Sequence, residues 1–263
     1  MHAFKYHRPA SVNDAAKLAK GEAKLLAGGQ TLVQTMKLRL ASPSDIIDLG
    51  TLKELSGIQS DGKTVTIGAM TRHAEVADSP EVKKAIPALA ALAGMIGDRQ
   101  VRAMGTIGGS LANNDPAADY PAAALGLGAT IVTNKRKLSA GEFFKGMFST
   151  ALQDGEIITA VSFPAPRRAA YSKFKNTASR FAIVGVFVAD FGNSVRVAVT
   201  GAGPSVFRQA DMEKALTAKF APESVANIKQ KQDGLNSDLH ASAEYRAHLV
   251  TVMARRAVEA ALA

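Results

Sequence analysis

Two short stretches decide how this chain can be interpreted: Ala27-Gly28-Gly29-Gln30-Thr31, the first glycine loop, and Thr106-Ile107-Gly108-Gly109-Ser110, the second glycine loop. The first lies between an expected strand at 23–27 and an expected helix at 31–39. A Gly pair permits positive φ and lets backbone N–H groups approach a ligand without an intervening Cβ. Successive N–H groups beside a helix N-terminus suit the oxygens of a phosphate group.

A single Gly pair would most simply mark a tight turn. Neither loop matches GxGxxG or GxxxxGK[ST], so the sequence disfavours Rossmann and P-loop nucleotide sites. Thr31 and Ser110 place one hydroxyl donor in each loop. Two loops of similar chemistry favour one diphosphate that is held from two sides.

The composition limits the chemistry that the chain can carry out alone. With 263 residues, 47% apolar and 21% charged, it is typical of a globular protein with one large or two smaller domains. The absence of Cys excludes disulfides, thiol nucleophiles and iron–sulfur ligation by this chain. Only 5 scattered His remain, so we predict no metal site. We assign no catalytic acid, base or nucleophile.

The balance of charges is basic, with 32 Lys+Arg against 23 Asp+Glu and a net charge of +9. The basic residues are spread thinly and the chain has no Trp. This favours simple solvation or docking to acidic proteins over nucleic-acid binding. No apolar run approaches the roughly 20 residues of a spanning helix, and the start has no apolar signal region. We therefore expect a cytoplasmic protein without a membrane span.

Strands and helices alternate along the chain, which favours an α+β architecture. Pro164 and Pro166 mark the best boundary, dividing residues 1–166, with subdomains at about 1–50 and 51–166, from residues 167–263. Residues 181–189 are nearly all apolar and predict a strand buried on both faces. The spacing of apolar residues predicts one helix over 79–96 and an amphipathic helix near the C-terminus. His73 is expected on a helix surface.

The residues around the two glycine loops carry a specific resemblance to one protein family. Met36-Lys37-Leu38-Arg39-Leu40 follows the first loop, residues 104–113 contain the second, and Asp115-Pro116-Ala117-Ala118-Asp119-Tyr120-Pro121 continues it. Near the C-terminus, residues 240–249 (His240 to Leu249) match the last domain of the same family. Nearly the whole chain thus resembles the FAD-binding medium subunits of molybdenum hydroxylases, the family of aerobic carbon monoxide dehydrogenase and xanthine dehydrogenase.

The resemblance implies a vanillyl-alcohol-oxidase-type (PCMH) FAD-binding fold of two α+β subdomains, plus a C-terminal α+β domain. Both glycine loops would contact the FAD diphosphate. Asp119 would lie near the sugar-alcohol chain of the flavin, cap a helix over 120–126, or do both. Phe181 would approach the isoalloxazine where Tyr is usual, or alternatively be a core residue. The predicted cofactor-binding residues are Ala27, Gly28, Gly29, Gln30, Thr31, Thr106, Ile107, Gly108, Gly109, Ser110, Asp119 and Phe181.

The resemblance also implies a function. A large subunit with a molybdenum–pterin cofactor would oxidise the substrate, and a small subunit with iron–sulfur clusters would pass electrons to FAD on this chain. An external acceptor would then receive them, in an assembly with two copies of each subunit. The rivals are a self-sufficient FAD-dependent oxidase or reductase and a basic adaptor without flavin.

Overall fold

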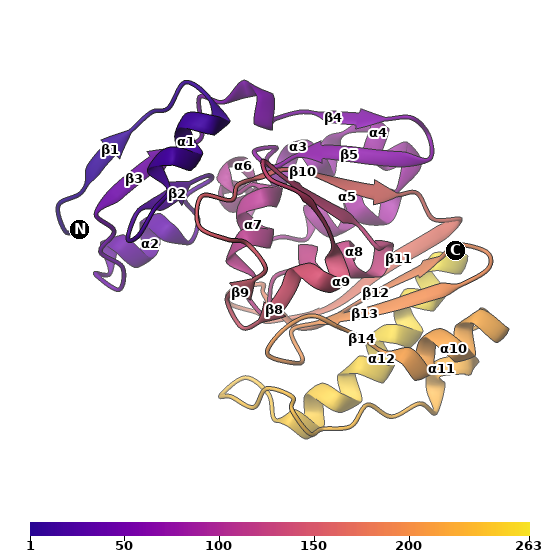
Figure 1. Ribbon diagram of the computed structural model, residues 1–263. Helices are drawn as coiled ribbons and strands as arrows, with labels where there is room; N and C mark the ends of the chain where they lie inside the picture. Colours follow the sequence, from indigo (N-terminus) through magenta and orange to yellow (C-terminus); the bar gives the residue numbers. More distant parts are fainter.

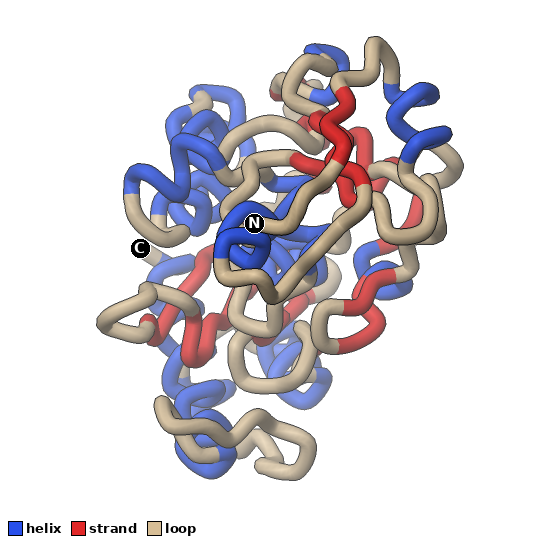
Figure 2. Tube along the Cα trace, turned by 90° about the vertical axis from the view of Figure 1, so that its left-hand side faces the viewer, coloured by secondary structure: helices blue, strands red, loops and turns tan.

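The computed structural model describes residues 1–263, whose N-terminal part forms a small parallel sheet at one end of the molecule (Figure 1). The strand order is β1-β3-β2, and both pairings are parallel. Parallel neighbours need crossover connections, which two short helices supply. The N-terminal sheet faces the viewer in Figure 2. These elements are β1 (Lys5–His7), α1 (Val12–Leu18), β2 (Lys24–Leu26), α2 (Leu32–Lys37) and β3 (Asp45–Asp48).

A second, antiparallel sheet has the order β4-β5-β10-β6-β7. Its central strand β10 comes from the end of this region and pairs with β5 and β6, so the helical segment lies between paired strands in the sequence. The strands are β4 (Ile58–Ser60), β5 (Thr64–Gly68), β6 (Thr130–Thr133), β7 (Lys137–Ser139) and β10 (Ile158–Pro164). The other elements are η1 (Lys53–Leu55), α3 (His73–Asp78), α4 (Pro80–Ala85), α5 (Pro87–Gly94), α6 (Arg99–Met104), α7 (Ile107–Asn113), α8 (Tyr120–Leu127), α9 (Ala140–Phe143), β8 (Phe144–Gly146) and β9 (Ser149–Thr150).

A third sheet of four antiparallel strands lies between two layers of helices. Helices α5 and α8 contact one face, and α10 and α12 contact the other, as the lower half of Figure 1 shows. The predicted burial of residues 181–189 on both faces is therefore confirmed for 182–189 in β12, where all residues but Ile183 are buried, and is wrong at Phe181, which is exposed. The elements are β11 (Arg168–Lys175), β12 (Ala182–Asp190), β13 (Val195–Thr200), β14 (Phe207–Arg208), α10 (Ala210–Ala218), α11 (Glu223–Ala226) and α12 (Ala243–Leu262).

The prediction of one helix over 79–96 is wrong in one respect, because the structure has two helices there, α4 and α5. Pro87 has no N–H to continue the first helix, and Ile86 leaves the helical region at φ −143°. Ile86, Leu89 and Ala93 are nevertheless buried as their spacing predicted. The apolar spacing therefore identified the buried face correctly, whereas Pro87 divided the stretch into two helices.

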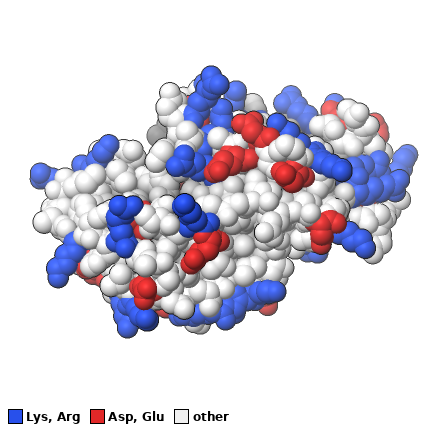
Figure 3. All heavy atoms as spheres, turned by 90° about the horizontal axis from the view of Figure 1, so that it is seen from above, with Lys and Arg blue, Asp and Glu red and all other residues white.

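The surface agrees with the dispersed charge of the sequence. On the face shown in Figure 3, Lys and Arg form several separate groups, with Asp and Glu between some of them. Among the helices, none combines the length and apolar character needed to cross a membrane.

Candidate functional site

The two glycine loops, far apart in the sequence, touch each other in the structure. A Cβ on Gly28 would lie 2.1 Å from the Met104 carbonyl oxygen and 2.7 Å from the Gly105 Cα, just before the second loop. A Cβ on Gly109 would lie 3.5 Å from the Cβ of Ala27. Glycine at position 28 thus allows two backbone segments to pack together with no side chain between them. This contact joins the N-terminal sheet to the helical region.

The first glycine loop carries a run of unused hydrogen-bond donors. It begins where β2 ends and stops where α2 begins, and Gly29 turns the chain at φ +71°. The backbone N–H groups of residues 28–31 donate to no acceptor in the protein. Consecutive free amides at the start of a helix suit an anion with several oxygens. The residues of this loop therefore fit the diphosphate of a dinucleotide.

The second glycine loop is organised differently, because the amides of residues 107–110 already have partners. Thr106 precedes α7 and its Oγ1 accepts from the Gly109 amide at 3.2 Å, while its carbonyl oxygen accepts from the Ser110 amide at 3.0 Å. The Ile107 and Gly108 amides donate to the Thr71 and Ala69 carbonyls, at 3.1 and 2.8 Å. The Ser110 hydroxyl, by contrast, has no partner in the protein. The structure thus assigns most free amide donors to the first loop, whereas the sequence suggested equal roles.

Asp119 is buried at the start of α8, where its carboxylate accepts two hydrogen bonds from β11. The Tyr171 hydroxyl lies 2.5 Å from Oδ1 and the Lys173 ammonium 2.8 Å from Oδ2. Asp119 occupies the N-cap position of α8, as the alternative role predicted, but its side chain makes no capping hydrogen bond. Burial raises the pKa of Asp119, and the adjacent ammonium of Lys173 opposes that shift. Its contact with the flavin remains a prediction.

The two lysines of β11, Lys173 and Lys175, have different environments. Lys173 is 2% exposed at its side chain, and its ammonium also donates to the Met95 carbonyl at 3.2 Å, beyond the end of α5. Lys175 is exposed. A buried ammonium is tolerated here because a carboxylate and a carbonyl surround it. Lys173 therefore connects the third sheet to two segments of the helical region.

Phe181 is 48% exposed, so its alternative role as a core residue is wrong. The loop before it is tightly held: Arg180 has a φ of +62°, and the Asn176 side chain accepts from the amides of Ala178 and Ser179. The next residue, Ala182, donates its amide to the Ala117 carbonyl at 3.3 Å. The structure thus brings Phe181 beside the segment that leads to Asp119.

His73 is a residue whose position the sequence analysis missed. It is only 5% exposed, and its Nε2 lies 2.6 Å from the point where a Cβ of Gly105 would be. Its ring packs on Tyr120 at 5.3 Å between centroids. Burial, aided by the charge of Arg102, lowers the pKa of His73 to about 4. The spacing of His73 and Val76 on one face of α3 was the available signal for its burial.

The neutral form of His73 should make this region sensitive to acid. Because its pKa is below 6.5 in the folded protein, the unfolded state takes up a proton first as the pH falls. We expect the free energy of unfolding to fall by roughly 2 kcal/mol from this group between pH 7 and pH 4.5. The His73→Phe variant should lose that part of the pH dependence in urea unfolding. An identical pH dependence in both proteins would contradict the assignment.

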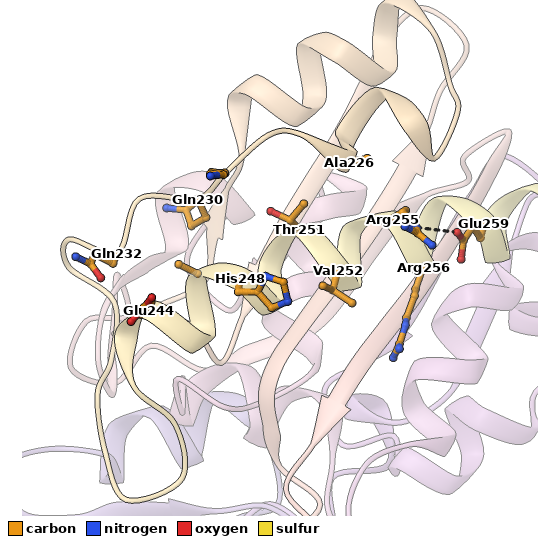
Figure 4. Close-up of a pocket in the computed structure, with 12 residues that line it drawn as sticks. Ala226, Gln230, Gln232, Glu244, His248, Thr251, Val252, Arg255, Arg256 and Glu259 are labelled. Carbon is orange, nitrogen blue, oxygen red and sulfur yellow. Dashed lines mark hydrogen bonds and ion pairs between the residues drawn. The ribbon is translucent and has the colours of Figure 1, made fainter.

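A separate pocket of about 710 Å³ lies on the outer face of α12 (Figure 4). Its lining residues lie on α12, at the end of α11 and in the segment after α11, and none of them belongs to the predicted site residues. Arg255 is paired there with Glu259 at 3.0 Å. The lining mixes both signs of charge and defines no single class of ligand. The charged lining residues are Lys229, Glu244, Arg255, Arg256 and Glu259.

Comparisons with known proteins show the family of the chain. Residues 2–166 match the FAD binding domain in molybdopterin dehydrogenase, and residues 169–261 match the CO dehydrogenase flavoprotein C-terminal domain. The chain belongs to the medium, FAD-binding subunits of the molybdenum hydroxylases. Members of this family are FAD-dependent oxidoreductase subunits, and the α+β fold expected from the sequence is confirmed.

Individual relatives cover the chain from end to end. The carbon monoxide dehydrogenase medium chain of Hydrogenophaga pseudoflava is 36% identical over 99% of this chain and 97% of its own length. The nicotine 6-hydroxylase medium subunit of Paenarthrobacter nicotinovorans is also 36% identical, over 97% and 96% respectively. A structure of reconstituted CO dehydrogenase from Oligotropha carboxidovorans aligns with a TM-score of 0.90 at 32% identity, covering 99% of this chain and 98% of that chain.

Proposed function

We propose that this chain is the electron-transfer subunit of a molybdenum hydroxylase complex. It would hold FAD, receive electrons from the iron–sulfur clusters of a small subunit and deliver them to an external acceptor. FAD, when bound, supplies the redox chemistry, and the chain binds it, orients it and excludes water from it.

The observation that carries this proposal is the contact between the two glycine loops. The first loop offers unused amides of residues 28–31, and the Ser110 hydroxyl of the second loop lies in the segment that packs beside it. A buried diphosphate needs several donors, because an unpaired buried anion is costly. In this proposal residues 1–166 form the FAD-binding unit and residues 167–263 complete the flavin site through Phe181.

The remaining parts of the proposed complex lie in other chains. A chain without Cys cannot ligate iron–sulfur clusters through thiolates, so these would belong to the small subunit. A large subunit would carry the molybdenum–pterin cofactor and the substrate pocket, with two copies of each subunit in a cytoplasmic complex. The relatives named above act on carbon monoxide and nicotine, so the substrate would be set by the large subunit.

The proposal is tested by purifying the chain with its natural partners and identifying the bound flavin. We expect yellow protein, release of FAD rather than FMN on denaturation, and co-purification of a large and a small subunit. Reduction of the flavin should require the small subunit when the substrate of the complex is the reductant. A preparation that binds no FAD, or a flavin that the substrate reduces without any partner, would contradict the proposal.

Phe181 should affect the flavin without affecting the stability of the fold. Since its side chain is 48% exposed, Phe181→Ala should change the free energy of unfolding by only about 0.5 kcal/mol or less. We expect a shifted flavin absorption spectrum or an altered rate of reoxidation by oxygen. Phe181→Tyr, which restores the usual family residue, serves as the matched variant. An unchanged spectrum, reduction potential and oxygen reactivity in Phe181→Ala would remove Phe181 from the flavin site.

A further inference from the structure

The stretch from His240 to Leu249 resembles the last domain of the family, yet it touches neither glycine loop and has no role in the proposed function so far. One of its residues, Arg246, the fourth residue of α12, is only 4% exposed. A guanidinium stays charged at any physiological pH, so its burial demands partners. The identity of those partners indicates what the residue does.

The guanidinium of Arg246 joins three segments that are distant in the sequence. Nη1 donates to the Ile183 carbonyl at 2.7 Å and to the Gly201 carbonyl at 2.9 Å. Nη2 donates to the Asp238 carboxylate at 2.8 Å. Nε is buried without a partner. Arg246 thus leaves one of its own donors unsatisfied while it binds the start of β12 and the residue after β13.

These two strand ends come unusually close together. Gly201 has a φ of +82°, and a Cβ there would lie 2.6 Å from the Ala182 carbonyl oxygen and 2.7 Å from that of Ile183. Carbonyl oxygens that converge in a buried place repel one another, since each carries a partial negative charge. A cation between them offsets that repulsion, and charge-assisted hydrogen bonds are about twice as strong as neutral ones.

The same strand ends hold the segment between the second glycine loop and Asp119. Gly201 donates its amide to the Pro116 carbonyl at 2.8 Å, and Ala182 donates to Ala117 at 3.3 Å. The Thr200 hydroxyl lies 3.1 Å from the Pro116 carbonyl oxygen and 2.7 Å from that of Ala118. The position of residues 116–118 therefore depends on the ends of β12 and β13 that Arg246 links by hydrogen bonds. Phe181 immediately precedes the same end of β12.

We propose that Arg246 is a positioning residue for the flavin site: from α12 it fixes the ends of β12 and β13, and through them Phe181 and residues 116–119. This inference rests on the proposed function, because it assigns Arg246 to a site that holds FAD. Arg246 itself touches neither glycine loop, so it acts only through these strand ends.

The experiment compares Arg246→Met, Arg246→Lys and the control Arg255→Met in the complete complex. Arg255 lies on the same helix, but its side chain is exposed and paired only with Glu259. If circular dichroism shows that the Arg246→Met variant is folded, we expect its Kd for FAD to rise about tenfold or more, as the loss of two charge-assisted hydrogen bonds allows. Arg246→Lys, which keeps the charge, should recover part of the affinity, and Arg255→Met should match the wild type.

Amide hydrogen exchange gives a second readout that does not depend on FAD. Without flavin, the amides of Ala182 and Gly201 should exchange faster in Arg246→Met and Arg246→Lys, while amides in β10 should keep their wild-type rates. If a folded Arg246→Met binds FAD as tightly as wild type, with unchanged exchange at these two amides, the positioning role is refuted. If Arg246→Met does not fold, Arg246→Lys alone decides, by the same two measurements.

Failure of the proposed function has a different signature. Wild-type protein would then bind no FAD, although Ala182 and Gly201 would still exchange faster in the Arg246 variants. If the wild-type protein binds FAD, but no folded Arg246 variant changes either the Kd for FAD or the amide exchange, only the role of Arg246 is refuted.

Discussion

Replacing Gly28 with Val should lower the affinity for FAD at least about 100-fold, because two donor groups of the diphosphate site would be displaced. The new Cβ would lie 2.1 Å from the Met104 carbonyl oxygen and 2.8 Å from its carbonyl carbon. These are backbone atoms, which cannot rotate away as a flexible side chain would. The two glycine loops must therefore separate, and a diphosphate held by both would lose one side of its site. Equilibrium titration of the flavin-free protein with FAD measures the effect.

The matched control is Gly94→Ala, at the end of α5. A Cβ on Gly94 would meet no heavy atom within 4 Å, so this variant should bind FAD as the wild type does. Circular dichroism and the thermal unfolding midpoint show whether each variant is folded. Tight binding of FAD by a folded Gly28→Val would mean that the contact between the loops is not needed for the cofactor.

Lys173→Met should destabilise the protein by about 3–5 kcal/mol, the usual effect of removing one partner from a buried ion pair. The Asp119 carboxylate would remain buried with only the Tyr171 hydroxyl as a side-chain partner. Because burial already raises the pKa of Asp119, the variant should protonate this group more readily than the wild type. Protonation favours the folded state when the folded pKa is the higher one, so the stability deficit should shrink as the pH falls. Urea unfolding at several pH values tests both expectations.

Lys175→Met provides the control for this second prediction. It removes the same charge from the same strand, but from an exposed side chain, so stability should change by less than about 0.5 kcal/mol. The double variant Asp119→Asn with Lys173→Met removes both charges and should recover part of the lost stability. If Lys173→Met and Lys175→Met proved equally stable, the buried pair would contribute nothing to the fold.

Much of the architecture could be predicted from local sequence. Ser11 caps α1 as an N-cap residue should, with its hydroxyl accepting from the Asp14 amide at 3.1 Å. The apolar run of β12 and the amphipathic pattern of α12 were visible because burial of one face or two imposes a period on the residues. Helices α6 and α7, by contrast, lie in a Gly-rich stretch whose short apolar runs gave no such period.

For a related reason, the candidate site could be predicted only in part from the sequence. The Gly pairs marked both loops, but the free amides of the first and the satisfied amides of the second depend on partners such as Ala69 and Thr71. His73 was placed on the surface because a polar residue on a short helix usually faces water. Its burial beneath Gly105 is set by how α3 packs against the second loop.

By itself, the sequence determined the α+β class, the two glycine loops, the absence of thiolate ligands and the family to which the chain belongs. These features are local, since a residue's backbone preference and the spacing of its apolar neighbours are written along the chain. Only the tertiary structure decided that Gly28 meets the second loop, that Lys173 neutralises Asp119 and that Arg246 ties β12 to β13. Each of these contacts joins residues far apart in the sequence, and the energy of a buried charge depends on the groups that folding places around it.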